Sequence, residues 1–144
     1  MDYNGVENFN LISGYASMFK KYAQFNGRSR RSEYWFAMLA NAILTQLVYL
    51  IALIPSIMDF VTYGEFTPKT EFISLIIQIV LIIYWVVTLI PSAAIIIRRL
   101  HDTGKSGWWI LLEFVIVGQI VLIVFLAQDS QPGWNKYGPN PKGR

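Results

Sequence analysis

The fold is decided by one uncharged stretch, Tyr34 to Met58, which reads YWFAMLANAILTQLVYLIALIPSIM. Its twenty-five residues include no Asp, Glu, Lys, Arg or His. As a helix rising about 1.5 Å per residue, the stretch reaches roughly 37 Å, which exceeds the roughly 30 Å hydrocarbon core of a bilayer. Backbone amides find no water inside lipid, so the stretch is expected to form a membrane-crossing helix.

Two further apolar stretches follow the first. Phe72 to Ile97 is a second uncharged run of twenty-six residues, and Gly107 to Gln128 is a third of twenty-two in which Glu113 is the one charge. An apolar share of 54% and a mean hydropathy of +0.41 also argue against a soluble domain. We therefore predict an all-α integral membrane protein with three transmembrane helices.

An amphipathic segment precedes the first predicted span. Apolar residues recur there at helical spacing, and these are Leu11, Tyr15, Met18, Tyr22 and Phe25. The pattern predicts an interfacial helix from about Phe9 to Gln24, with a helix packed on the cytoplasmic ends of the spans as the open alternative. The chain then divides into a cytoplasmic N-terminal segment (1–33), a three-span domain (34–128) and a turn-rich tail (129–144).

The distribution of Lys and Arg predicts the orientation. Five precede the first span, Lys69 alone separates the first two, three separate the second and third, and three lie in the tail. A cytoplasmic N-terminus places eight of these cations inside and four outside, as the positive-inside rule favours. The Arg98 to Ser106 loop is then cytoplasmic, and the Asp59 to Glu71 loop and the tail lie outside. A re-entrant third segment that keeps the C-terminus inside is the alternative.

The composition excludes several kinds of site. The chain has no cysteine, which rules out disulfides, thiolate metal sites and cysteine nucleophiles, and one histidine rules out a multi-histidine metal cluster in a single chain. We expect no metal and no cofactor. The N-terminus lacks the pattern of a cleaved signal peptide. Nucleic-acid binding is not expected either, because the basic residues adjoin the predicted spans without a readout module.

Two polar and aromatic blocks fall on the predicted cytoplasmic face, Phe25 to Trp35 and Arg98 to Trp109. Guanidinium groups bind phosphate in bidentate fashion, and each cation near an anionic leaflet contributes about 1 kcal/mol. The blocks are therefore candidates to bind anionic lipid or a partner protein; the alternative is that they only set orientation. The candidate residues are Arg28, Arg30, Arg31, Glu33, Trp35, Arg98, Arg99, His101, Asp102, Trp108 and Trp109.

These blocks resemble those of the family catalogued as domain of unknown function 805, small bacterial inner-membrane proteins. The resemblance covers nearly the whole chain from Tyr22 on, and it implies a membrane location and fold but no established activity. Its first motif is Phe25, Gly27, Arg28, Arg31, Glu33, Tyr34 and Trp35. Its second is the run Arg98 to Asp102 followed by Gly107, Trp108 and Trp109, and its third is Gly133, Asn135, Tyr137, Gly138, Pro139, Asn140 and Pro141.

His101 and Asp102 raise the possibility of acid–base chemistry, because histidine titrates near neutral pH. Neighbours on a helix point about 100° apart, however, so Asp102 is poorly placed to orient His101. We expect both to bond the arginines of the first block, and Arg98 and Asp102 to pair if the second span continues helically to a stop at Gly104. A membrane enzyme that acts on lipid headgroups through His101 and Asp102 is one alternative function.

Four polar residues lie inside the predicted spans. Glu113 is expected to face protein, because an uncompensated charge at that depth costs about 2.5 to 3.5 kcal/mol. Asn41 lies at a similar depth, and Gln46 and Gln119 lie near the midplane. We therefore predict that spans one and three touch, with Asn41 near Glu113 and Gln46 bonded to Gln119. A homo-oligomeric transporter or channel component that titrates Glu113 is the other alternative function.

The sequence as a whole favours a non-enzymatic scaffold or adaptor in the bacterial inner membrane. Its expected partners are anionic lipids, and a membrane protein or a second copy of the chain is also possible.

Overall fold

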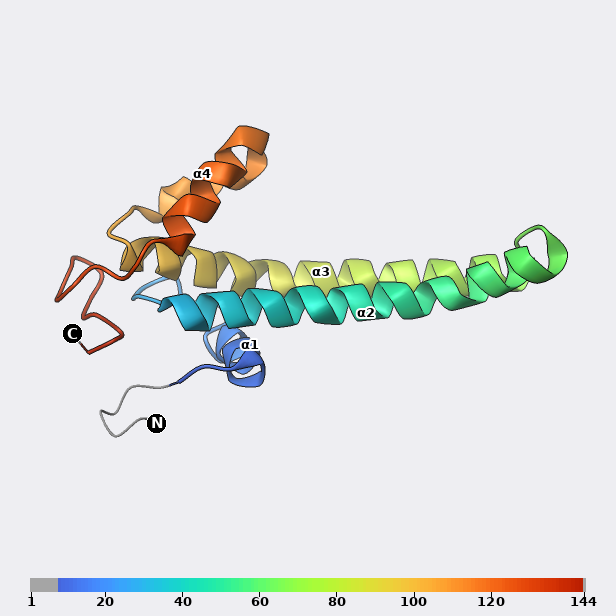
Figure 1. Ribbon diagram of the computed structural model, residues 1–144, viewed down its shortest axis with the longest axis horizontal. Coiled ribbons are helices and arrows are strands. Elements are labelled where there is room, and N and C mark those ends of the chain that lie inside the picture. Colours follow the sequence, from blue (N-terminus) through green and yellow to red (C-terminus); the bar gives the residue numbers. More distant parts are fainter. Residues whose placement is uncertain (1–7, 144) are drawn as a thin grey trace. The chain divides into compact units, whose positions relative to one another are not determined.

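The computed structural model describes residues 8–143, which form helices and connecting segments (Figure 1). The elements are α1 (Leu11–Lys20), α2 (Arg31–Tyr63), α3 (Pro68–Asp102), the 3₁₀ helix η1 (Gly107–Phe114) and α4 (Ile116–Ala127). The predicted all-α class is confirmed. The contacts divide the chain into two units, one of residues up to Ala40 together with those from Ile90 on, and one of Asn41–Leu89.

Helix α1 begins at a capping box and packs on the start of α2. The Asn10 side chain accepts from the Ser13 amide at 2.8 Å, and the Ser13 hydroxyl accepts from the Asn10 amide at 2.8 Å. A Cβ placed on Gly14 would lie 2.9 Å from Cβ of Phe36, so glycine permits the close approach of the two helices. This packing is the second of the two alternatives for the segment, although Leu11 and Ile12 remain exposed.

Helices α2 and α3 contain the first two predicted spans and are long and apolar enough to cross a membrane. They have 33 and 35 residues, and they continue through Pro55 and Pro91. Only 6% of the most apolar 18-residue stretch of each helix is buried in the protein. The core helix of a soluble protein buries such a stretch, so the exposed apolar side chains of α2 and α3 require an apolar surrounding.

The unit of Asn41–Leu89 is a hairpin of the adjoining parts of α2 and α3. Gly64, at φ +74°, follows the last residue of α2, and Pro68 occupies the first position of α3. The Asp59 carboxylate holds the connection by accepting from the Thr67 amide at 3.0 Å, the Thr67 hydroxyl at 2.6 Å and the Thr70 hydroxyl.

The third apolar run is not the single helix that the sequence predicts. It forms η1 and α4, which pack against each other and are separated by Val115 in an extended conformation. A Cβ on Gly118 would lie 2.6 Å from the Leu112 carbonyl oxygen, so the absence of a side chain permits this turn back. At a rise of about 1.5 Å per residue, the 12 residues of α4 reach roughly 18 Å, which is too short to cross a bilayer.

The apolar core of the first unit lies among α1, the start of α2, the end of α3 and α4. Its buried residues are Met18, Tyr34, Ala37, Ile95, Leu100, Leu122 and Leu126.

Candidate functional site

The two arginine-bearing blocks meet at one buried carboxylate. Nε of Arg28 donates to Oδ1 of Asp102 at 2.9 Å, and Nη1 of Arg99 donates to Oδ2. The side chains of Arg28, Arg99 and Asp102 are 1%, 0% and 0% exposed, and we call these three residues the Arg–Asp cluster. The expected bond between Asp102 and a first-block arginine is thus present, at Arg28.

Arg28 also holds the tail. Its Nη2 donates to the Gln131 carbonyl at 2.6 Å, and its Nη1 donates to the carbonyls of Gly133 at 2.9 Å and Gly138 at 3.2 Å. A weaker bond of 3.4 Å reaches the Asp102 carbonyl. The planar guanidinium offers five donors in fixed directions, so this single side chain joins the end of α3 to the tail.

Arg99 joins the end of α4 to the same cluster. Its Nε donates to the Leu126 carbonyl at 2.9 Å, its Nη2 donates to the Gln128 carbonyl, and its Nη1 reaches the Ser29 carbonyl at 3.3 Å. The last carbonyls of a helix have no partner within the helix and carry partial negative charge. Arg99 satisfies these acceptors, which fixes where α4 ends.

The tail therefore lies on the same face as the N-terminal block. Besides its bonds to both arginines, Asp102 accepts from the Ser130 hydroxyl at 2.6 Å, and its carbonyl accepts from the Gln131 amide at 2.9 Å. These contacts bring the tail beside the N-terminal block, because the turn between η1 and α4 returns the chain to the cluster that it left after α3. The side of the membrane on which the tail lies stays a prediction.

Glu33 connects α1 to the cluster region. Its Oε1 accepts from the Ser17 hydroxyl at 2.6 Å and from Nζ of Lys21 at 2.7 Å, and its Oε2 accepts from the Ser29 hydroxyl at 2.8 Å. The Glu33 side chain is 3% exposed. This carboxylate therefore fixes internal structure and is not free to receive a ligand cation.

His101 contacts the first block and the tail. Its Nδ1 lies 3.2 Å from the Gly27 carbonyl oxygen, and its ring stacks on Tyr137 with the centroids 3.6 Å apart and the planes at 7°. The expected arginine partner is thus replaced by a backbone carbonyl and an aromatic ring. A carbonyl only accepts, so Nδ1 carries the hydrogen and Nε2 of the neutral ring keeps its lone pair.

Arg98 is buried without a partner. Its residue is 1% exposed, and none of its three guanidinium nitrogens has a hydrogen-bond acceptor among residues 8–143. The predicted pairing of Arg98 with Asp102 is wrong because the carboxylate is occupied by Arg28, Arg99 and Ser130. Burying a charge without hydrogen bonds is costly, and the negative charge of Glu33 offsets this cost in part.

The remaining cations and aromatic residues of the two blocks lie nearer the surface. Arg31 is exposed, and the Arg30 guanidinium lies 6.0 Å from the centroid of the Phe9 ring. Trp35 is 39% exposed beside Tyr34. Trp108 is 79% exposed, whereas Trp109 packs edge-on against Phe125. Arg31, Trp35 and Trp108 are therefore exposed, unlike Arg28 and Arg99.

Two of the four polar residues in the predicted spans form side-chain hydrogen bonds. Asn41 accepts at Oδ1 from the Tyr84 hydroxyl at 2.6 Å, within the Asn41–Leu89 unit. Gln119 donates from Nε2 to the backbone carbonyl of Glu113 at 2.9 Å. Gln46 and the Glu113 residue are exposed. The pairings of Asn41 with Glu113 and of Gln46 with Gln119 stay predictions.

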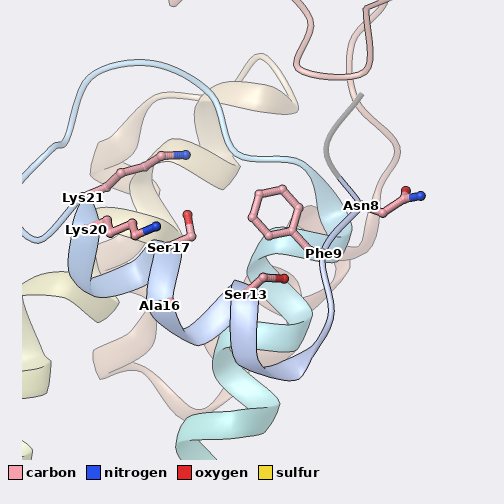
Figure 2. A pocket seen from close by; sticks show the side chains of 7 residues that line it. All are labelled: Asn8, Phe9, Ser13, Ala16, Ser17, Lys20 and Lys21. Carbon is pink, nitrogen blue, oxygen red and sulfur yellow. The ribbon is translucent and has the colours of Figure 1, made fainter. Parts of the chain in front are cut away.

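A hollow of about 370 Å³ lies beside α1, and Figure 2 shows the side chains that surround it. Lys20 is exposed at its edge, and Lys21 reaches from it to Glu33. Two ammonium groups beside hydroxyls form a set of hydrogen-bond donors suited to an anionic group. The lining residues are Asn8, Phe9, Ser13, Ala16, Ser17, Lys20 and Lys21.

Sequence reasoning did not identify the partners that complete the site. Ser17, Lys21, Ser29 and Ser130 supply side-chain donors, and the tail supplies backbone carbonyls. The tail motif was the available signal, because its glycines adopt positive φ and expose carbonyls to Arg28. Gly133 has φ +65° and Gly138 has φ +128°.

Comparison with known proteins identifies a family whose matched region contains these motifs. The chain matches the family described as "Protein of unknown function (DUF805)" over residues 22–139, which include the Arg–Asp cluster. It belongs to this family. The similar proteins include inner membrane protein YhaI of Escherichia coli (strain K12), 38% identical over 129 residues, which are 89% of this chain and 94% of the relative. No solved structure matches the chain.

A second relative has a name of the same kind. Inner membrane protein YhaH of Escherichia coli (strain K12) is 35% identical over 129 residues, covering 89% of this chain and 95% of the relative. Together with the two long apolar helices, these names support a location in a bacterial inner membrane.

Proposed function

We propose that this protein is a non-enzymatic membrane scaffold whose folded cytoplasmic face binds anionic lipid headgroups. The observation that carries the proposal is the position of the Arg–Asp cluster, which holds α3, α4 and the tail together as one surface. Lys20, Arg31 and Lys136 are exposed in the same unit. A fixed basic surface next to a membrane suits a protein that binds lipid and presents a platform to a partner.

The proposed topology has two crossings and a re-entrant hairpin. Helices α2 and α3 cross the bilayer, and η1 with α4 enters and leaves on the cytoplasmic side. Of the twelve Lys and Arg residues in the chain, Lys69, the second residue of α3, is the one that lies next to the connection between α2 and α3. If the tail lies on the N-terminal side, all the Lys and Arg residues except Lys69 lie on that side. The positive-inside bias is then stronger than in a topology with three crossings, and this supports a cytoplasmic tail.

The cations that bind lipid in this proposal are the exposed ones. Arg28 and Arg99 are excluded because their guanidinium groups are buried and already bonded. Lys20, Arg31 and Lys136 are exposed. Each contributes about 1 kcal/mol near an anionic leaflet, so three together favour binding without any single residue being essential. The hollow beside α1 offers the exposed Lys20 to a headgroup phosphate, whereas Lys21 is bonded to Glu33.

A scaffold fits the contacts better than an enzyme does. The Asp102 carboxylate bonds Arg28, Arg99 and Ser130, while His101 bonds the Gly27 carbonyl. A general acid or base needs a free group within reach of the substrate, and Asp102 is fully buried in a structural role. Asp102 is therefore proposed to stabilise the fold rather than to catalyse, and His101 bonds a backbone carbonyl rather than a carboxylate that would support acid–base chemistry.

The test uses purified protein in nanodiscs that contain equal amounts of phosphatidylcholine and phosphatidylglycerol. Native mass spectrometry after release measures which lipids are retained. We expect the protein to retain phosphatidylglycerol preferentially, and the triple variant Lys20→Gln, Arg31→Gln, Lys136→Gln to lose that preference. The control Lys69→Gln, which removes a cation from the first turn of α3, is expected to behave like the wild type. Equal retention of both lipids by the wild type would refute the proposal.

A further inference from the structure

His101 lines a second hollow, separate from the one beside α1. This hollow has a volume of about 380 Å³, and Ile97, Ile110, Leu111 and Trp108 provide most of its apolar lining. Ser106, Gly107 and Tyr137 complete it. An apolar hollow with a few polar groups is the usual form of a small-molecule site.

His101 lines this hollow and carries an unused acceptor. Nδ1 is bonded to the Gly27 carbonyl, so the opposite nitrogen, Nε2, carries the lone pair of the neutral ring. A Cβ on Gly107 would lie 3.3 Å from Nε2, and Gly107 itself lines the hollow. Within the described chain, Nε2 has no hydrogen-bond partner. The stack on Tyr137 holds the ring in this orientation.

The surroundings limit what the hollow accepts. An acceptor at Nε2 selects a ligand that donates, namely a hydroxyl or an amine. The Lys136 ammonium lies 4.9 Å from the centroid of the Tyr137 ring, which disfavours a cationic ligand and favours an anionic one. The apolar side chains and the 79% exposed Trp108 favour a ligand with an apolar body at the membrane interface.

We infer that this hollow binds an anionic phospholipid through a headgroup hydroxyl, which donates a hydrogen bond to Nε2 of His101. The glycerol headgroup of phosphatidylglycerol has this chemistry. The inference rests on the proposed function, because it adds hydroxyl recognition to a surface that binds anionic lipid. In this inference His101 selects the headgroup by its hydroxyl, whereas the exposed cations select lipid by its negative charge alone.

The test compares two lipids of equal charge. Phosphatidylglycerol carries headgroup hydroxyls, and phosphatidylmethanol carries the same single negative charge with none. Both are offered together in nanodiscs, and native mass spectrometry measures the ratio retained. One neutral hydrogen bond changes affinity by roughly 2- to 10-fold, so the wild type is expected to retain phosphatidylglycerol over phosphatidylmethanol by a ratio in that range.

Two variants test the residue assignment. His101→Asn keeps a side-chain donor for the Gly27 carbonyl but removes the acceptor at Nε2. Gly107→Ala keeps His101 but places a methyl group 2.9 Å from Cγ2 of Ile97 and 3.3 Å from Nε2, which narrows the hollow. Both are expected to bring the retained ratio to one while total anionic lipid stays unchanged. Thermal melting identifies any variant that fails to fold.

The outcomes separate this inference from the proposed function. A wild-type ratio of one, with both anionic lipids preferred over phosphatidylcholine, overturns the hydroxyl site and leaves the basic surface intact. A ratio above one that both folded variants keep also overturns the role of His101. If neither anionic lipid is preferred over phosphatidylcholine, the proposed function itself fails.

Discussion

Arg28 and Asp102 lie 74 positions apart in the chain, and their side chains are joined at 2.9 Å in a buried ion pair. The pair connects the segment before α2 to the last residue of α3. Arg28 extends the connection to the tail through the carbonyls of Gln131 and Gly133. The cluster therefore determines where three separate segments lie, and its removal is expected to affect all of them.

Arg28→Met is expected to release the tail and lower the stability of the protein. Asp102 then keeps Arg99 but loses one of its two buried ion pairs, so the cost is expected to be at most the roughly 3 to 5 kcal/mol of an unpaired buried charge. Arg28→Lys keeps the charge but cannot reproduce the planar set of donors, so it is expected to rescue only part of the loss. Thermal unfolding in detergent measures stability, and limited trypsin cleavage at Lys136 measures tail release. Wild-type behaviour of Arg28→Met would show that the pair has no structural role.

Arg98 and Arg99 are expected to respond in opposite directions to the same substitution. Arg99→Met removes bonds to Asp102 and to the end of α4, so it is expected to destabilise the protein. Arg98→Met replaces a buried guanidinium that has no hydrogen-bond acceptor in the described residues. Because the Glu33 charge also attracts this guanidinium, the expected gain is smaller than the about 1 to 4 kcal/mol typical of a buried ion pair replaced whole. Melting temperatures of the two variants, compared with the wild type, test this contrast. A loss on Arg98→Met would mean that Arg98 has an acceptor supplied from outside the described chain.

Gly118→Ala tests the turn between η1 and α4. The added methyl group would meet the Leu112 carbonyl at 2.6 Å, and backbone atoms move less easily than side chains. The methyl group is expected to push η1 away from α4 and to lower the free energy of unfolding by about 1 to 3 kcal/mol. The control Val117→Ala shortens a 70% exposed neighbour and is expected to leave the melting temperature unchanged. Equal melting temperatures for both variants would contradict the close packing at Gly118.

The tail also contains a carboxylate whose titration reports its local contact. A hydrogen bond from Lys142, together with one from the Ser130 amide, holds the pKa of Asp129 below its ordinary value of 3.8. Because the pKa of Asp129 is lower in the folded protein, the contact stabilises the tail at pH values above the unfolded-state pKa. This contribution is lost as the pH falls through the folded-state pKa. NMR titration is expected to find the Asp129 pKa below 3.8 in the wild type and higher in Lys142→Met. An unchanged pKa in Lys142→Met would argue against the contact.

The sequence predicts α2 and α3 well because an uncharged run of that length has few other stable conformations in lipid. It also predicts the meeting of Arg28 with Asp102, since both blocks flank spans on one face. It does not predict the turn at Val115, because composition is the same for a straight helix and for a hairpin. It does not predict the tail contacts either, since Arg28 binds carbonyls there, and every residue type has a carbonyl.

The proposed topology puts the tail on the same side of the membrane as α1 and the connection between α2 and α3 on the other side. The chain has no cysteine, so single substitutions give an unambiguous label. Lys20→Cys, Glu65→Cys and Lys136→Cys place one thiol in α1, in the connection and in the tail, at exposed positions.

A membrane-impermeant maleimide is then applied to intact cells and to inverted membrane vesicles. The account predicts that Lys20→Cys and Lys136→Cys react only in inverted vesicles and that Glu65→Cys reacts only in intact cells. Reaction of Lys136→Cys together with Glu65→Cys in intact cells would contradict it.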